Sequence, residues 1–332
     1  MSKKVVTIGE IMMRLSTPGY ARFVQADSMD VVYAGSEANV AVSLSLFGMQ
    51  AAHVTRFPEH DLGRAATQAL ERYGVDVRHI AYGPERIGVY FLENGAMQRP
   101  SRIIYDRFDS AFANIKLEHV DWDAILDGAS WFHYTGITPA ISQGAADVCL
   151  AGAKKARARG IKVSGDINYR RNLWQYGKTA RDIMPALIEQ TDVVVAGTTD
   201  FENCAGISGT DFTDTCRRAI EAFPNISKIT STHRESVSSS HNRMRAQLWD
   251  GRTLYTSREY DLTHIVDRVG TGDAYMAGLI YGWLNEKSDQ QTLEFAIAAC
   301  ALKHSVPGDV NLVTVAEVEA LQSGENVGKL LR

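Results

Sequence analysis

The sequence predicts an α/β protein built on a doubly wound, mostly parallel sheet with helices on both faces. Of its 332 residues, 45% are hydrophobic and 22% are charged, as in ordinary globular proteins. From about residue 130 onward, short β-branched runs alternate with helical patterns, which is typical of parallel sheets covered by helices. Two segments of loosely alternating polar and aromatic residues, near 14–34 and 82–107, interrupt this pattern and predict a small second sheet.

The first part of the chain alternates between strand and helix signals. A β-branched run that ends at Gly9 predicts a buried strand. Each of the two helical patterns that follow is closed by a glycine, Gly48 or Gly74, which is a common helix stop. The elements expected here are strands at 5–8 and 51–55 and helices at 36–47 and 62–73.

The second insert carries a hairpin signal. A strand pattern at 88–92 is followed by Asn94-Gly95, a dipeptide that favours a tight turn between antiparallel strands. The run at 102–107 supplies a second strand. The sequence therefore predicts an antiparallel pair within this insert.

The second half of the chain is regular. Its strand signals are short and rich in β-branched residues, and its helical signals are longer and amphipathic. The expected elements are strands at 130–134, 162–167, 192–196 and 226–231, helices at 142–159, 178–189 and 211–223, a β-rich stretch at 243–265, and helices at 272–286, 289–305 and 314–322.

Charge and cysteine usage exclude several classes of protein. The chain has 35 Lys and Arg residues and 39 Asp and Glu residues. The resulting net charge of −4 argues against binding to nucleic acid or to an anionic membrane through the overall charge of the protein. The four cysteines lack CxxC spacing, which argues against zinc-ribbon and redox motifs and favours a reducing cytoplasm. The longest apolar span, 274–284, is too short to cross a bilayer.

The segment Gly270-Thr271-Gly272-Asp273 opens a helix of small and apolar residues. Its glycines have no side chains and can leave successive backbone N–H groups accessible to a ligand. Together with the helix N-terminus, these groups form an anion-binding nest. The carboxylate of Asp273 could take a proton from an attacking hydroxyl beside a bound phosphate. The simpler interpretation is a glycine-rich turn with an aspartate that the helix dipole favours in the first turn.

A second polar constellation lies far upstream, at the start of the helix expected over 36–47. Gly35 permits close backbone approach, and Asn39 offers both a donor and an acceptor to a polyol. The simpler interpretation is a helix whose N-cap is Ser36, with Glu37 in the first turn.

Taken together, these motifs resemble the ribokinase-like (PfkB) sugar kinase family over about 4–322. The resemblance implies ATP, Mg²⁺, a sugar hydroxyl as phosphoryl acceptor, and one kinase domain over 1–332 with a β lid formed by the inserts at 14–34 and 82–107. It makes Asp273 the catalytic base, with the anion hole at Gly270, Thr271 and Gly272. The motifs that carry it are, in order, Gly9 after the first strand, the Gly35/Asn39 helix, Asp61-x-Gly63 with Gly74-Val75-Asp76, and Gly270-x-Gly272-Asp273.

Within that family, the segments 132–140 and 166–174 look like those of 2-keto-3-deoxygluconate kinases. By this resemblance, Arg107 and Arg170 clamp the substrate carboxylate, and a guanidinium suits a carboxylate because it can bind both oxygens. The alternatives are that Arg170 pairs with Asp166, and that Arg107 pairs with Asp106 or Asp109. The other substrate-binding residues expected are Gly35, Ser36, Asn39, Tyr90, Tyr105 and Ile137.

The sequence also departs from the family. Members that bind neutral sugars typically carry an aspartate where this chain has Arg14, which favours an acidic substrate, unless Arg14 simply faces water. The usual Asn-x-x-Glu motif is replaced by residues 197–200, where Asp200 keeps a carboxylate for magnesium and phosphate. The nucleotide-side loop is replaced by residues 231–236, where Arg234 either supplies charge near the phosphates or is a surface charge.

The resemblance further places adenine near Cys300, His304 and Asn311, although His304 has the alternative of a half-buried structural histidine. It also suggests a monovalent cation, such as K⁺, near Asp267. Lid strands of this family often pair across a dimer, so a homo-oligomer is expected, with Tyr90, Phe91, Tyr105 and Phe108 either at that surface or closing over their own pocket.

The predicted function is therefore ATP-dependent phosphorylation of a hydroxyl of 2-keto-3-deoxygluconate. One alternative is a kinase of the same fold that acts on a neutral sugar such as fructose. A second is a non-catalytic sugar-acid-binding protein, supported only by the altered loops at 197–200 and 231–236. A dinucleotide-binding dehydrogenase is disfavoured, because Gly9-Glu10-Ile11-Met12 is no GxGxxG helix opening.

Overall fold

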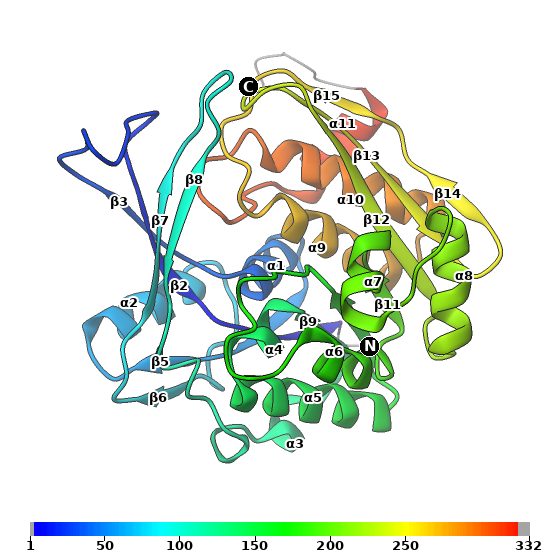
Figure 1. Cartoon of the computed structure of the whole chain (residues 1–332), viewed down its shortest axis with the longest axis horizontal. Helices are drawn as coiled ribbons and strands as arrows, with labels where there is room; N and C mark the ends of the chain where they lie inside the picture. The colour runs from blue at the N-terminus through cyan, green and yellow to red at the C-terminus, as the bar shows by residue number, and fades with distance from the viewer. Residues whose placement is uncertain (1–2, 325–332) are drawn as a thin grey trace.

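The computed structural model describes residues 3–324, so residues 1–2 and 325–332 of the domain predicted over 1–332 lie outside the described residues. A nine-stranded sheet forms the centre of the molecule (Figure 1). Its order is β14 (Leu254–Thr256), β13 (Asn242–Trp249), β12 (Lys228–Ser236), β11 (Val193–Val195), β10 (Lys162–Asp166), β9 (Ala129–Thr135), β1 (Lys4–Ile8) and β4 (Gln50–Val54), and β15 (Tyr260–Leu262) pairs with β13.

The sheet is parallel from β4 to β12 and antiparallel beyond β12. Side chains alternate between its two faces, so that Val5 joins one hydrophobic core and Val6 the other. The core on the first face involves α1 (Ser36–Leu46), α2 (Asp61–Glu71), α9 (Thr271–Leu284), α10 (Asp289–Lys303) and α11 (Val315–Ser323). The core on the second involves α3 (Trp122–Ile125), α5 (Gln143–Ala158), α6 (Ala180–Ile188), α7 (Thr198–Ala205) and α8 (Phe212–Ala222).

The predicted doubly wound architecture with helices on both faces is therefore confirmed. The predicted second sheet is present as well, as four strands that stand beside the central sheet in Figure 1. We call this four-stranded sheet the lid sheet. Its order is β3 (Asp30–Ala34), β2 (Met12–Ser16), β7 (Gly88–Glu93) and β8 (Arg102–Asp106). The remaining short elements are β5 (Arg56–Pro58), β6 (Ala81–Gly83), the 3-10 helix Leu117–His119 and α4 (Ile137–Ile141).

The hairpin of the lid sheet turns at a different place from the one predicted. Strands β7 and β8 are antiparallel, as expected, but the tight turn falls at Met97 and Gln98, where Ala96 and Arg99 exchange backbone hydrogen bonds of 3.0 and 2.9 Å. Gly95 is needed for close approach rather than for the turn, because a Cβ atom there would overlap the carbonyl oxygen of Arg99.

Three further elements differ from the sequence prediction. The expected helix at 142–159 is α5, and a separate short helix, α4, precedes it. Helix α7 lies where only a phosphate-site motif was expected, at 197–200. The residues interpreted as a nucleotide-side loop, 231–236, continue β12 instead, because they pair in antiparallel register with β13. No helix within 3–324 has both the length and the apolar character that crossing a bilayer requires.

The substitution Gly278→Ala tests how closely α9 packs on α10. Its new Cβ atom would lie 2.6 Å from the Cα of Ala296, which packed side chains do not tolerate. We expect the melting temperature to fall, although alanine favours a helix over glycine by about 1 kcal/mol. Gly272→Ala, in the same helix, meets no atom within 4 Å and is the control, whose melting temperature should hold or rise. Equal calorimetric melting temperatures for both variants would contradict the packing.

Candidate active site

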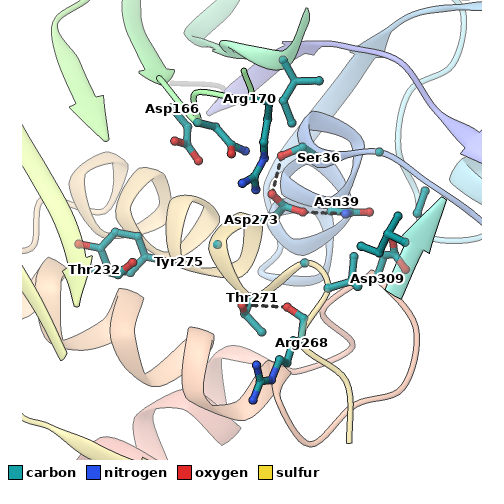
Figure 2. A pocket seen from close by; sticks show the side chains of 18 of the residues that line it. Ser36, Asn39, Asp166, Arg170, Thr232, Arg268, Thr271, Asp273, Tyr275 and Asp309 are labelled. Carbon is teal, nitrogen blue, oxygen red and sulfur yellow. Dashed lines mark hydrogen bonds between the residues drawn. The ribbon is translucent and has the colours of Figure 1, made fainter. Parts of the chain in front are cut away.

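A cavity of about 890 Å³ lies where the carboxyl ends of the parallel strands meet the lid sheet. Open α/β sheets commonly bind ligands at this edge. Its walls come from the start of α1, the segments that follow β10 and β11, the strand β12, the lid sheet and the loop before α9. Figure 2 shows that side chains far apart in the sequence, such as Ser36, Arg170 and Asp273, meet here.

Asp273 lies in the first turn of α9 with its carboxylate held by two side chains of α1. Ser36 donates its hydroxyl to Oδ1 at 2.6 Å, and Asn39 donates its amide to Oδ2 at 2.7 Å (Figure 2). Burial raises the pKa of Asp273 to about 6, and the two hydrogen bonds oppose that rise. The carboxylate is therefore mostly ionised at neutral pH and can accept a proton.

The start of α1 is fixed by close backbone packing. A Cβ atom at Gly35, the N-cap residue of α1, would overlap the carbonyl oxygen of Glu10, so only glycine fits there. Ser36 and Asn39, predicted to bind substrate, both line the cavity and both contact Asp273. The Oδ1 atom of Asn39 is buried and has no hydrogen-bond partner within residues 3–324.

The start of α9 also lines the cavity, at Gly270, Thr271 and Gly272. Gly270 has φ of 81°, and a Cβ atom there would overlap the carbonyl oxygen of Asp309. Thr271 donates its hydroxyl to the carbonyl oxygen of Arg268 at 3.0 Å, which braces the turn. The backbone N–H groups of a first helical turn lack acceptors within the helix, so this end of the cavity suits an anion.

Arg107 lies in the cavity wall, but its charge already has a partner. Its Nε donates to Glu10 at 2.7 Å, its Nη2 contacts the same carboxylate oxygen, and Ser110 donates to the other oxygen at 2.5 Å. The alternative that Arg107 pairs with Asp106 or Asp109 is wrong, because Asp106 pairs with Arg86 and the Arg107 side chain turns inward to Glu10.

Arg170 differs from Arg107, because it lies in the cavity wall without a direct partner. Within residues 3–324 its guanidinium forms no hydrogen bond or ion pair, and in Figure 2 it points toward Asp273. The alternative that Arg170 is neutralised by a close ion pair with Asp166 is therefore wrong, although its charge lowers the pKa of that carboxyl.

Two further carboxylates, those of Asp166 and Asp200, line the cavity. Burial, followed by the charges of Asp200 and Asp273, raises the pKa of Asp166 to about 8. Asp200, at the start of α7, accepts the backbone N–H groups of Gly197 at 2.8 Å and Tyr169 at 3.2 Å. Residues 3–324 contain no cluster of three metal-ligating side chains, but Mg²⁺ often uses only one or two carboxylates together with water and phosphate oxygens.

Asp267, the predicted ligand of a monovalent cation, is paired with Arg14. The two side chains meet at 2.7 Å and both are buried, so the alternative that Arg14 faces water is wrong. Asp267 also accepts the backbone N–H groups of Val269 and Gly308, each at 3.0 Å. With both carboxylate oxygens engaged, Asp267 does not fit a bound cation.

The residues predicted to contact adenine do not reach the cavity. Cys300, His304 and Asn311 are all buried and absent from its lining. The Nδ1 atom of His304 lies 2.8 Å from the carbonyl oxygen of Cys300, one turn earlier on the same helix, and donates a hydrogen bond to it. Both polar atoms of the Asn311 side chain lack partners within residues 3–324. Arg234, by contrast, lines the cavity and is exposed.

The sequence reasoning missed several residues of the cavity wall. Glu10 directly follows Gly9, the first residue after β1, and Asp309 follows Gly308, so an acidic residue after a loop glycine was the available signal. The side chains that line the cavity without having been predicted to do so include Glu10, Asp166, Thr232, Arg268, Tyr275 and Asp309, and the predicted set of Tyr90, Tyr105 and Ile137 also lines it.

The fold and this cavity define a carbohydrate kinase. The model of the pfkB family of carbohydrate kinases matches residues 2–314, and the chain belongs to this family. It is 31% identical to a 2-dehydro-3-deoxygalactonokinase of Haloferax volcanii, over 99% of both chains. A crystal structure of 2-dehydro-3-deoxygluconokinase from Thermotoga maritima is similar, with a TM-score of 0.92 and 42% identity over 97% of this chain and 100% of that one.

A more distant solved structure shares the fold. It is a putative ribokinase II from E. coli in complex with ATP and Mg²⁺, with a TM-score of 0.82 and 19% identity over 98% of this chain and 100% of that one. The predicted membership of the family, the ribokinase-like fold and the class of enzyme, a phosphotransferase with an alcohol group as acceptor, are confirmed.

The substitution Asn39→Ala tests how Asp273 is tuned. It removes a hydrogen bond that favours the charged carboxylate, so the pKa of Asp273 should rise above its value of about 6. Since protonated Asp273 cannot accept a proton, the acid limb of kcat/KM should move to higher pH. Ser43→Ala, one turn along α1, removes a hydroxyl that donates to the Asn39 carbonyl oxygen at 2.9 Å and is the control. A pH–rate profile with the same acid limb in both variants would rule out this role for Asn39.

Proposed function

We propose that this kinase transfers the γ-phosphoryl group of ATP, with Mg²⁺, to a hydroxyl of 2-keto-3-deoxygluconate. One observation carries the proposal: Asp273 is held at the anion-binding start of α9, and the guanidinium of Arg170, which has no partner in the described part of the chain, faces the same cavity. A base beside an anion site is what phosphoryl transfer to an alcohol requires, and a free guanidinium suits an acidic acceptor. The names of the Haloferax and Thermotoga relatives support a 2-keto-3-deoxy sugar acid.

The proton of the accepting hydroxyl passes to Asp273, which Ser36 and Asn39 orient toward the cavity. The backbone N–H groups at Gly270, Thr271 and Gly272 stabilise the negative charge that develops on the transferred group. Mg²⁺, when bound, neutralises charge on the phosphate oxygens. Asp166 and Asp200 would hold it, because both carboxylates line the cavity and a cation would relieve their mutual repulsion.

The carboxylate of the acceptor binds Arg170 in this proposal, and Arg107 assists it. Arg107 contributes less, because Glu10 already takes its Nε and Nη2 groups. Gly35, Tyr90, Tyr105 and Ile137 shape the pocket around the sugar.

The nucleotide phosphates lie toward β12 in this proposal, where Arg234 adds positive charge to the cavity wall. Adenine contacts at Cys300, His304 and Asn311 are not part of this proposal, because these buried side chains do not line the cavity. A monovalent cation at Asp267 is left out of the proposal, since Arg14 takes its place there.

The acid named for the Haloferax relative differs from the proposed substrate only in the configuration at one carbon, so 2-keto-3-deoxygalactonate is a second candidate. Turnover of Mg-ATP should be measured with both acids and with fructose. The proposal predicts the highest kcat/KM for 2-keto-3-deoxygluconate. Equal or better turnover of fructose would overturn the assignment to sugar acids, and a preference for the galactonate would correct the epimer.

We further propose that the chain works as one kinase domain in the cytoplasm and pairs through its lid sheet. The four cysteines are free and buried, as suits a reducing compartment. Tyr105 and Phe108 are 50% and 67% exposed at the lid sheet and its end, as a pairing surface needs. Tyr90 follows the other expectation and closes over its own pocket, because it is buried, lines the cavity and donates to Asp309.

The substitution Asp273→Asn tests the catalytic base. It keeps the size of the side chain but removes its proton acceptor, so kcat should fall by about 10²–10⁴, the usual contribution of a positioned base. The KM for the sugar acid should change far less, because Asp273 acts on the proton rather than on the carboxylate. Steady-state kinetics with Mg-ATP measure both, and a near-normal kcat would remove Asp273 from this role.

The substitution Arg170→Ala tests recognition of the carboxylate. The lost charged hydrogen bond should cost about 1.5–3 kcal/mol, seen as a higher KM for the acid, while a neutral, carboxylate-free analogue should be affected little. Arg170→Lys should rescue poorly, since an ammonium lacks the fork of the guanidinium. The neighbouring Arg171, which is exposed and outside the cavity lining, provides the control Arg171→Ala. An unchanged preference for the acid in Arg170→Ala would mean that another group binds the carboxylate.

A further inference from the structure

A buried cluster of charges connects the lid sheet to the start of α9. Arg14, in strand β2 of the lid sheet, forms ion pairs with Asp267 and Asp309. Arg14 is 3% exposed, Asp267 5% and Asp309 3%, so the ion pairs are shielded from water. A second strand of the lid sheet joins them, because the hydroxyl of Tyr90 in β7 also donates to Asp309.

Both acidic partners of Arg14 shape the loop that carries the anion hole. Asp267 accepts the backbone N–H groups of Val269 and Gly308, so it fixes the approach to Gly270 and joins it to the 308–309 segment. The carbonyl oxygen of Asp309 packs where a Cβ atom of Gly270 would lie. The position of the Gly270 backbone therefore depends on both aspartates, and both aspartates depend on Arg14.

Buried positive charge already faces both carboxylates of this cluster. The amine of Lys303 is fully buried beside it, donates to the carbonyl oxygen of Val306 at 2.9 Å, and interacts with the charges of Asp267 and Asp309. A monovalent cation bound at Asp267 would have to displace the guanidinium of Arg14, which would leave that buried charge without its ion pair, and this is costly.

We propose that the guanidinium of Arg14 is a built-in cation that replaces a bound monovalent ion, and that it positions the anion hole from the lid sheet. Arg14 is a positioning residue: it acts through Asp267 and Asp309 on the backbone of Gly270. This inference rests on the proposed role of the amides at 270–272 in phosphoryl transfer. It implies that turnover needs no K⁺ or Na⁺, and that removing the guanidinium creates a site for such an ion.

The test compares the wild-type protein with Arg14→Ala in K⁺ and in tetramethylammonium, an ion too large for the site, at equal ionic strength. Wild-type kcat should be the same in both salts. In tetramethylammonium, Arg14→Ala should lose kcat by up to about 10²–10³, the effect of one misplaced anion-hole donor, with a smaller change in KM. K⁺ or guanidinium should restore part of that kcat. Arg22→Ala removes an exposed arginine that follows β2 and is the control, with kcat unchanged.

A second readout does not depend on which sugar is used. K⁺ should raise the melting temperature of Arg14→Ala relative to tetramethylammonium, because a ligand that binds only the folded state stabilises it, and it should leave the wild type unaffected. If no sugar acid is turned over, the proposed function fails and this measurement still decides the inference. The inference about Arg14 would be overturned if the activity or the stability of the wild type depended on K⁺. It would also be overturned if Arg14→Ala had a raised KM, a normal kcat and no response to K⁺.

Discussion

The site depends on the carboxylate of Asp273, which is shared between the N-terminal ends of α1 and α9. Ser36 and Asn39 donate to its two oxygens, and the amides of its own helix lie beside it. Burial raises the pKa of this carboxyl, while hydrogen bonds and helix ends favour its charged form. The balance leaves a base that is ionised at neutral pH yet only weakly solvated. Because α1 and α9 are far apart in the sequence, the carboxylate of Asp273 meets Ser36 and Asn39 only in the folded protein.

Some arginines around the cavity form buried ion pairs within the protein, and another is left to bind a ligand. Arg14 and Arg107 each meet a buried carboxylate, from Asp267 and Asp309 in one case and from Glu10 in the other. Those pairs hold the lid sheet and the residues that follow it against the rest of the molecule, and they leave little charge for a ligand. Arg170 has no such partner among the described residues, 3–324, so its charge is available to an acidic substrate. Which arginine recognises the acid therefore depends on which arginines the fold has already neutralised.

Local patterns were sufficient to predict the fold and an anion site at the start of α9, whereas Arg107 and Arg170 were expected at the cavity from resemblance to a family. Periodicity placed the alternating strands and helices, and the glycines before Asp273 indicated an anion site at a helix start. Partners distant in sequence leave no local pattern, and so Glu10 for Arg107 and Asp309 for Arg14 were missed. The extension of β12 over 231–236 was also not predicted, because it depends on pairing with the distant strand β13. Cys300 and its neighbours were expected near adenine from resemblance alone, and no local signal reports whether a side chain reaches the cavity.

The role of Asp273 can be tested in a crystal structure of the protein with 2-keto-3-deoxygluconate and a non-hydrolysable ATP analogue. We expect one substrate hydroxyl within about 2.6–3.2 Å of Asp273. We also expect the γ-phosphate at the start of α9 and the substrate carboxylate on Arg170. A hydroxyl that meets a different side chain, with Asp273 still bound only to Ser36 and Asn39, would contradict this role of Asp273.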